Sequence, residues 1–187
     1  MKAGTEIVLI GGSAGSTNVL LKIFNALKPG IKFSIVLIMH RKRTPDFLLG
    51  NLISSRTSLP VKEAEEKEKI LPGNIYIAPP DYHLLFEKDY TFSLDVSEKI
   101  NFSRPSIDVS FSSAAIAYGN KAAAVLLSGA NADGTEGLKD IKRHGGIVAV
   151  QDYQTAESPY MPKYAIERVE KVIVLKAEEM AEFIQKL

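Results

Sequence analysis

Residues 6–21 read EIVLIGGSAGSTNVLL, an apolar run followed by a glycine-rich turn and an amphipathic segment. Residues 7–10 are too few for a helix and do not alternate with polar residues, which predicts a parallel strand covered on both faces. Three glycines bracket Ser13, and from Thr17 onward the apolar residues recur at helical spacing. Ser13 is therefore predicted to lie at the carboxyl end of a strand, directly before a helix.

This position favours negative charge near Ser13. Backbone N–H groups without partners and the positive end of the helix dipole point into such a turn. They can hold a bound phosphate or the oxyanion of an acyl-transfer reaction. The turn alone is compatible with both kinds of chemistry.

The composition is that of an ordinary globular protein, with 45% apolar and 24% charged residues in a chain of 187. A chain of this length can build one well-packed core, and we expect a single domain spanning residues 1–187. The net charge of +1 supplies no basic surface for a polyanion. Nucleic acid is therefore not an expected partner.

The chain has no cysteine, which excludes disulfides, thiol nucleophiles and cysteine metal sites and fits a reducing compartment. The first residues offer one lysine and a four-residue apolar run, which is too little for a signal-peptide core. No stretch approaches the ~20 apolar residues that span a bilayer. We expect a cytoplasmic protein that does not insert into membranes.

Apolar runs and helical patterns alternate along the chain, with glycine or proline at most boundaries. The expected strands are residues 7–10, 33–39, 75–77, 84–86, 91–94, 122–127, 147–150 and 172–175, and the expected helices begin near residues 17, 44, 106, 136 and 177. The charged segment 62–69 is interpreted as a solvated loop or edge. The alternation predicts an α/β fold with a three-layer, doubly wound, mostly parallel sheet and a small antiparallel excursion within residues 75–94.

Three expected strands carry a reactive side chain at or just beyond their carboxyl ends, where open α/β sheets place their ligands. Ser13 follows the first strand, His40 ends the second, and Asp133 lies in the loop after residues 122–127. A hydroxyl, an imidazole and a carboxylate are the parts of a serine hydrolase, in which the histidine takes the serine proton and the aspartate orients the histidine. We interpret these residues as a candidate triad.

Each residue also has a simpler interpretation. Ser13 could cap a helix or bind phosphate, His40 could be an ordinary hydrogen-bonded residue, and Asp133 could form a turn. Dinucleotide binding is a rival function, but residues 11–15 lack the G-x-G-x-x-G spacing. His40 and Arg41 also stand where the ribose-binding acid of such a site is expected.

Five blocks of the sequence stand out: IGGSAG at residues 10–15, LIMH at 37–40, YIAPPDYHL at 76–84, RPSIDVSF at 104–111 and LLSGANADG at 126–134. Together they resemble one family, the catalytic domain of CheB-type protein-glutamate methylesterases of bacterial chemosensory systems. Each block is weak alone, whereas all five in this order are highly specific. The resemblance extends from residue 7 to about residue 174.

The resemblance implies a doubly wound α/β domain that hydrolyses glutamyl methyl esters on the helical cytoplasmic region of chemoreceptors and releases methanol. Some members also deamidate glutamine. Ser13 matches the nucleophile of the family, His40 its general base and Asp133 its orienting acid. No metal and no organic cofactor are implied. His83 and Arg104 lie in family-like blocks and are candidate substrate contacts, although a turn histidine and a loop-anchoring arginine are equally good interpretations.

The chain departs from the family pattern in both loops that flank the candidate nucleophile. Ala14 replaces a threonine and Ser16 a glycine in the first loop, whereas Ala130 and Asn131 replace a methionine and a glycine in the second. These changes are expected to alter hydrogen bonding and pocket shape more than the triad itself.

Members of the family typically carry an N-terminal phosphorylation-receiver domain, whereas this chain begins six residues before its first expected strand. Three interpretations stay open: a constitutively exposed site, regulation by a separate receiver or other signalling protein, and a piece cut from a longer chain.

The mechanism expected from the resemblance is attack by Ser13 on the ester carbonyl, with the backbone N–H of Ala14 among the donors that hold the oxyanion. Two other functions are compatible with the sequence. One is a binding module of low activity that docks a receptor or regulator through the same cleft, and the other is a small-molecule esterase. An intact set of Ser13, His40 and Asp133 favours the enzyme.

Overall fold

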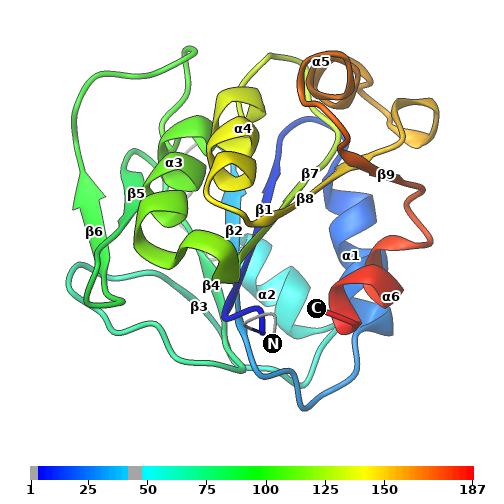
Figure 1. Ribbon diagram of the computed structural model, residues 1–187. Helices are drawn as coiled ribbons and strands as arrows, with labels where there is room; N and C mark the ends of the chain where they lie inside the picture. Colours follow the sequence, from blue (N-terminus) through cyan, green and yellow to red (C-terminus); the bar gives the residue numbers. More distant parts are fainter. Residues whose placement is uncertain (1–3, 42–47) are drawn as a thin grey trace.

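The computed structural model describes residues 4–41 and 48–187 as a sheet flanked by helices (Figure 1). The strands are β1 (Ile7–Gly12), β2 (Ser34–Met39), β3 (Val61–Glu63), β4 (Ile75–Ile77), β5 (His83–Phe86), β6 (Phe92–Asp95), β7 (Ala122–Leu126), β8 (Ile147–Gln151) and β9 (Ile173–Leu175). The α-helices are α1 (Thr17–Ala26), α2 (Leu48–Ser54), α3 (Ile107–Tyr118), α4 (Thr135–Arg143), α5 (Tyr160–Arg168) and α6 (Met180–Gln185).

The main sheet has seven strands in the order β3-β4-β2-β1-β7-β8-β9, and every neighbouring pair is parallel. The chain moves outward from β1 in one direction and then restarts beside β1 with β7. This reversal confirms the predicted doubly wound sheet, and it opens a crevice at the carboxyl ends of the central strands. β5 and β6 form a separate antiparallel pair, which is the predicted excursion.

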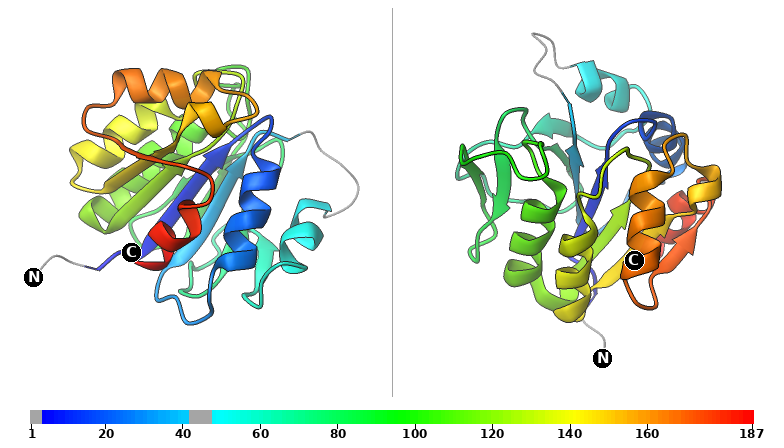
Figure 2. Two further views of the ribbon diagram at one scale, coloured as in Figure 1. Left: turned by 90° about the vertical axis from the view of Figure 1, so that its right-hand side faces the viewer. Right: turned by 90° about the horizontal axis from the view of Figure 1, so that it is seen from above.

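Helices cover both faces of the sheet, as the two views of Figure 2 show. One buried cluster joins one face of the sheet to α3, α4, α5 and the β5-β6 pair, and a second cluster joins the other face to α1, α2 and α6. The central strands β1, β2 and β7 are buried along their whole length because both of their faces are covered. Within residues 4–41 and 48–187, no helix is both long enough and apolar enough to cross a bilayer.

Two local features differ from the expectations. The first is β4, which belongs to the main parallel sheet rather than to the antiparallel excursion. The charged segment 62–69, predicted to be a solvated loop or edge, begins inside β3 at the edge of the sheet. The second is α5, a helix that the sequence pattern does not predict, which forms at residues 160–168 although Pro162 stands inside it. Pro162 is the third residue of this helix, a position whose N–H has no partner within the helix in any case. The expected start of α2 at residues 44–46 lies outside the described residues.

Candidate active site

The register of the central strands sets Ser13 beside His40. Gly12 of β1 pairs with Met39 of β2, so the residues that follow them, Ser13 and His40, are also neighbours. The His40 N–H donates to the Gly12 carbonyl at 3.1 Å and continues the pairing of the strands. On the other side, the Ser13 N–H donates to the carbonyl of Ser128, just after β7, at 2.9 Å. The ends of β2, β1 and β7 therefore meet at one edge of the sheet.

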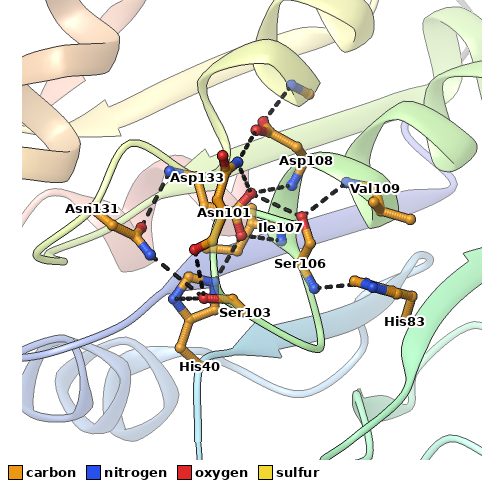
Figure 3. Close-up of polar contacts among 11 residues, drawn as sticks. His40, His83, Asn101, Ser103, Ser106, Ile107, Asp108, Val109, Asn131 and Asp133 are labelled. Carbon is orange, nitrogen blue, oxygen red and sulfur yellow. Dashed lines mark hydrogen bonds and ion pairs between the residues drawn. The ribbon is translucent and has the colours of Figure 1, made fainter. Parts of the chain in front are cut away.

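His40 and Asp133 are in direct contact although they come from strands on either side of β1. His40 Nε2 lies 2.8 Å from Asp133 Oδ2, and the Asp133 side chain is fully buried (Figure 3). Gly134 supports this approach. It has φ +96°, and an added Cβ would lie 2.6 Å from Leu126 Cδ1, so the chain can turn here into α4 only with glycine.

Four further donors surround the Asp133 carboxylate, and all of them come from residues 101–108 (Figure 3). They are Ile107 N at 2.7 Å, Ser106 Oγ at 2.9 Å, Asp108 N at 3.1 Å and Asn101 Nδ2 at 3.3 Å. Ser106 is the N-cap residue of α3, so the carboxylate lies against the positive end of this helix. The helix N-terminus thus supplies most of the binding site for the buried charge.

These contacts determine the charge state of Asp133. Burial alone would raise its pKa, but the hydrogen bonds from His40, Ile107 N and Asp108 N outweigh burial and lower the pKa of Asp133 to about 2. Asp133 is therefore a carboxylate at neutral pH. Its acceptor oxygen requires a hydrogen on Nε2 of His40, which leaves Nδ1 of the neutral ring as a proton acceptor.

The free nitrogen of His40 faces a hydroxyl from the loop before α3. Ser103 Oγ lies 3.4 Å from His40 Nδ1, and Asn131 Nδ2 lies 3.5 Å from the same hydroxyl. Among the described residues, the Ser13 hydroxyl makes no hydrogen bond to His40 or to any other group. In this structure, Ser103 therefore occupies the acceptor nitrogen of His40, whereas Ser13 neighbours His40 only through the register of the two strands.

The turn after β1 is built to leave N–H groups open beside Ser13. The Ser13 carbonyl accepts hydrogen bonds from Ser16 N at 3.2 Å and from Ser16 Oγ at 2.5 Å. Ser16, which departs from the glycine of the family pattern, thereby closes the turn with its buried hydroxyl. Within the described part of the chain, no backbone acceptor contacts the N–H of Ala14, which is exposed, or that of Gly15. Both groups can receive an anion.

His83 and Arg104 differ in their placement. His83 is fully buried, where Nδ1 accepts from Ser106 N at 3.1 Å and Nε2 donates to the Glu98 carbonyl at 3.0 Å. This geometry favours positioning of the α3 N-terminus over contact with substrate. Arg104 lines a cavity beside His40, and its Nη1 donates to the carbonyls of Val96 and Ser97, both at 2.7 Å.

That cavity has a volume of about 330 Å³ and is lined by His40, Arg41, Asp81, Lys99, Phe102, Ser103 and Arg104. Among residues 4–41 and 48–187, no cluster of histidine, aspartate and glutamate side chains has the arrangement of a metal site. The groups that this edge of the sheet presents are the Ser13 and Ser103 hydroxyls, the His40 imidazole, the Asp133 carboxylate and backbone N–H groups.

Asp108 is a second buried carboxyl beside Asp133. Burial raises its pKa to about 7; the Gly137 N–H, which donates to its Oδ1 at 2.8 Å, opposes this shift, and the negative charge of Asp133 reinforces it. Because the pKa of Asp108 is higher in the folded chain than its usual 3.8, its contribution to stability is complete below about pH 4. The contribution is lost as the pH rises through about 7.

Asp108→Asn is therefore expected to become more favourable for stability as the pH rises. Relative to the parent, its free energy of unfolding should increase by up to a few kcal/mol between pH 4 and pH 8, because the variant never buries this charge. Urea unfolding at both pH values measures the change, with the exposed carboxylate variant Glu167→Gln as the control. An Asp108→Asn effect of equal size at the two pH values would contradict the assignment.

The residues that support Asp133 and His40 are not among the site residues predicted from sequence. They are Asn101, Ser103, Ser106, Asp108 and Asn131. Ser106 carried a usable signal, because a serine directly before a helix is a typical N-cap. Asn131 was noted only as a departure from the family pattern. Its Oδ1 accepts from Asp133 N at 3.2 Å, which links it to the loop that presents the carboxylate.

Comparisons with known proteins identify the family of the chain. The family model of the CheB methylesterases matches residues 8–184. A protein of Leptospira interrogans named as a protein-glutamate methylesterase/protein-glutamine glutaminase is 44% identical over 182 residues, which cover 97% of this chain and 94% of that protein. A Thermotoga maritima protein with the same name is 37% identical over 185 residues, which cover 97% of this chain and 54% of that protein.

The fold agrees as closely as the sequence. The crystal structure of the Thermotoga maritima CheB methylesterase catalytic domain superimposes with a TM-score of 0.92 at 36% identity and covers 98% of this chain and 99% of that one. This match includes the seven-stranded parallel sheet and the helices on both of its faces. The chain belongs to the CheB methylesterase family.

Proposed function

We propose that the chain is a serine hydrolase that removes methyl groups from glutamate methyl esters on chemoreceptor-type proteins, with release of methanol. The observation that carries the proposal is the buried 2.8 Å contact between His40 and Asp133, beside a glycine turn that presents Ser13. The pair leaves Nδ1 of His40 as the acceptor at the edge of the sheet where the Ser13 turn lies. The names of the relatives support an ester of protein glutamate as the substrate.

In the proposed reaction, His40 Nδ1 takes the proton of Ser13 Oγ while this oxygen attacks the ester carbonyl carbon. The Ala14 N–H donates to the resulting oxyanion, and the Asp133 carboxylate stabilises the imidazolium. Collapse of the intermediate breaks the bond to the methoxy group, which takes the proton from His40 and leaves as methanol. Water then loses a proton to His40 and attacks the acyl-enzyme, which releases the glutamate carboxylate and restores Ser13.

The same residues can also deamidate glutamine, because an amide differs from the ester only in its leaving group. In that reaction His40 gives its proton to the departing nitrogen, and ammonia is released in place of methanol. The second half of the relatives' names supports this activity. The intact His40–Asp133 pair favours both activities over a pure binding module.

The proposed partner is the methylated cytoplasmic helical region of a chemoreceptor, which also places the reaction in the cytoplasm. Residues 1–187 act in this proposal as one catalytic domain, since the family model and the solved catalytic domain both match nearly all of them. Regulation by a separate receiver or other signalling protein is compatible with this arrangement. Arg104 is proposed to face the substrate from the cavity wall, whereas His83 acts by positioning Ser106.

Release of methanol from a methylated chemoreceptor cytoplasmic fragment of the source organism tests the proposal. The parent protein is expected to release methanol in amounts that match the esters lost, as followed by mass spectrometry of the fragment. The unmethylated fragment, whose glutamates are free carboxylates, serves as the control from which no methanol can be released. Absence of release from a fragment that the protein binds would contradict the proposed activity.

A further inference from the structure

Phe102 is placed unusually for a large apolar side chain. It is 99% exposed, although it lines the cavity that also contains His40. The next phenylalanine along the chain, Phe111, is by contrast fully buried in the core. The Phe102 ring is therefore exposed to solvent at the cavity of the candidate site. It offers an apolar contact surface to any molecule that enters this cavity.

The backbone at Phe102 is strained as well. Residues 100–103 form a tight turn in which Ile100 N donates to Ser103 O at 3.2 Å and Ser103 N donates to Ile100 O at 2.9 Å. The two central residues, Asn101 and Phe102, have φ +51° and +62°. Such a turn favours Asn followed by Gly, because positive φ crowds any larger side chain. Phe102 therefore stands where glycine would be more stable.

Contacts to the candidate site hold this strained turn in place. The amide of Asn101 donates to Asp133 Oδ1 at 3.3 Å and to Asp108 Oδ2 at 3.1 Å, and Ser103 Oγ contacts His40 Nδ1 at 3.4 Å (Figure 3). Both neighbours of Phe102 are thus tied to the His40–Asp133 pair. Strain that is kept next to reactive groups is typical of a functional position.

The charges around the cavity indicate the kind of substrate. Three basic residues and one acidic residue line it: Arg41, Lys99, Arg104 and Asp81. Arg41 is paired with Glu63, and the Arg104 guanidinium donates to backbone carbonyls. Lys99 is exposed and forms no ion pair with any residue that the structure describes. The cavity therefore presents a positive charge and an aromatic ring to an incoming chain.

We propose that Phe102 and Lys99 determine specificity for a protein substrate rather than for esters in general. Phe102 packs on the apolar surface beside the esterified glutamate, and Lys99 binds a free carboxylate of the same segment. An amphipathic, acidic helix with methylated glutamates meets both requirements. The inference rests on the proposed function and names the part of the chain that selects its substrate.

The first test compares two substrates. In Phe102→Ala, the ratio of kcat/KM for a methylated receptor fragment to kcat/KM for p-nitrophenyl acetate should fall about tenfold, because only the fragment uses the ring. The loss should appear mainly in KM for the fragment. Ile116→Ala removes another exposed apolar side chain, on the outer face of α3, and should leave the ratio unchanged. An unchanged ratio in Phe102→Ala would overturn the inference.

A second variant separates substrate contact from a structural role. Phe102→Gly removes the ring and relieves the positive φ, so its melting temperature should rise while its substrate ratio falls as in Phe102→Ala. Lys99→Gln should raise KM for the fragment at low salt, and this effect should shrink at high salt. A fall in melting temperature together with equal losses for both substrates would assign Phe102 to the framework and contradict the proposal.

Binding separates this inference from the proposed function. Affinity for the methylated fragment is measured in the Ser13→Ala background with and without Phe102→Ala. Suppose that Phe102→Ala weakens binding but the parent protein, with Ser13 present, releases no methanol. This result would leave the inference standing and contradict the proposed function. Equal binding alongside Ser13-dependent release of methanol would contradict the inference alone, and no binding together with no release of methanol would contradict both.

Discussion

Ser13→Ala is expected to lower methanol release from a methylated receptor fragment by about 10⁴-fold or more, with an unchanged melting temperature. The substitution removes the only atom that forms the acyl-enzyme. Stability should hold because the Ser13 hydroxyl makes no hydrogen bond within the described chain, and the turn is closed by its backbone and by Ser16. Single-turnover kinetics and thermal unfolding of the same preparation measure both quantities.

Ser103→Ala is the matched control for this variant. Like Ser13→Ala it removes a single serine hydroxyl, here the one whose Oγ lies 3.4 Å from His40 Nδ1. Its rate should fall by less than about tenfold, because Ser103 does not lie beside the open N–H groups that the first turn offers to an oxyanion. Loss of activity in Ser103→Ala with activity retained in Ser13→Ala would reverse the assignment of the nucleophile.

Asp133→Asn is expected to lower kcat by about 10³- to 10⁴-fold, because an amide no longer fixes the tautomer of His40 or stabilises the imidazolium. It should also destabilise the fold. The carboxylate accepts hydrogen bonds from Ser106, Ile107, Asp108 and Asn101 as well as His40, and an amide must turn its NH₂ group toward some of these donors.

The pH dependence of this destabilisation has a definite sign. Because the pKa of Asp133 is about 2 in the folded chain and lies below the ordinary carboxyl value, its contribution is present above about pH 4 and is lost as the pH falls toward 2. The stability difference between parent and Asp133→Asn should therefore be largest near neutral pH and should shrink in acid. Urea unfolding between about pH 2 and neutral pH measures this stability difference. Activity of Asp133→Asn near that of the parent would contradict the role of Asp133 and mean that another acid orients His40.

The doubly wound sheet could be predicted from sequence because its central strands are short apolar runs and most of its helices have clear boundaries. Because Ser13, His40 and Asp133 each follow the carboxyl end of a predicted strand, the sequence also predicts that they lie at one edge of the sheet. In the structure these strands, β1, β2 and β7, are neighbours. The edge strand β3 was harder to identify, because its residues are charged and only half-buried. Helix α5 was missed because Pro162 and two tyrosines obscure its apolar pattern.

The polar contacts around the site could not be predicted from spacing. Asn101 and Ser106 reach Asp133 across 32 and 27 residues of chain, and Ser103 reaches His40 across 63. No local pattern links residues that far apart. His83 shows the same limit, because its block was recognised while its burial and its bonds to Ser106 and Glu98 depend on the packing of the β5-β6 pair.

The most direct measurement identifies the residue that becomes acylated. The protein is treated with diisopropyl fluorophosphate, which modifies activated serine hydroxyls, and the adduct is located by peptide mass spectrometry. The predicted result is a single adduct on Ser13 that is lost in His40→Ala, because the hydroxyl depends on Nδ1 of His40 for its activation. An adduct on Ser103, or one on Ser13 that persists without His40, would contradict the proposed mechanism.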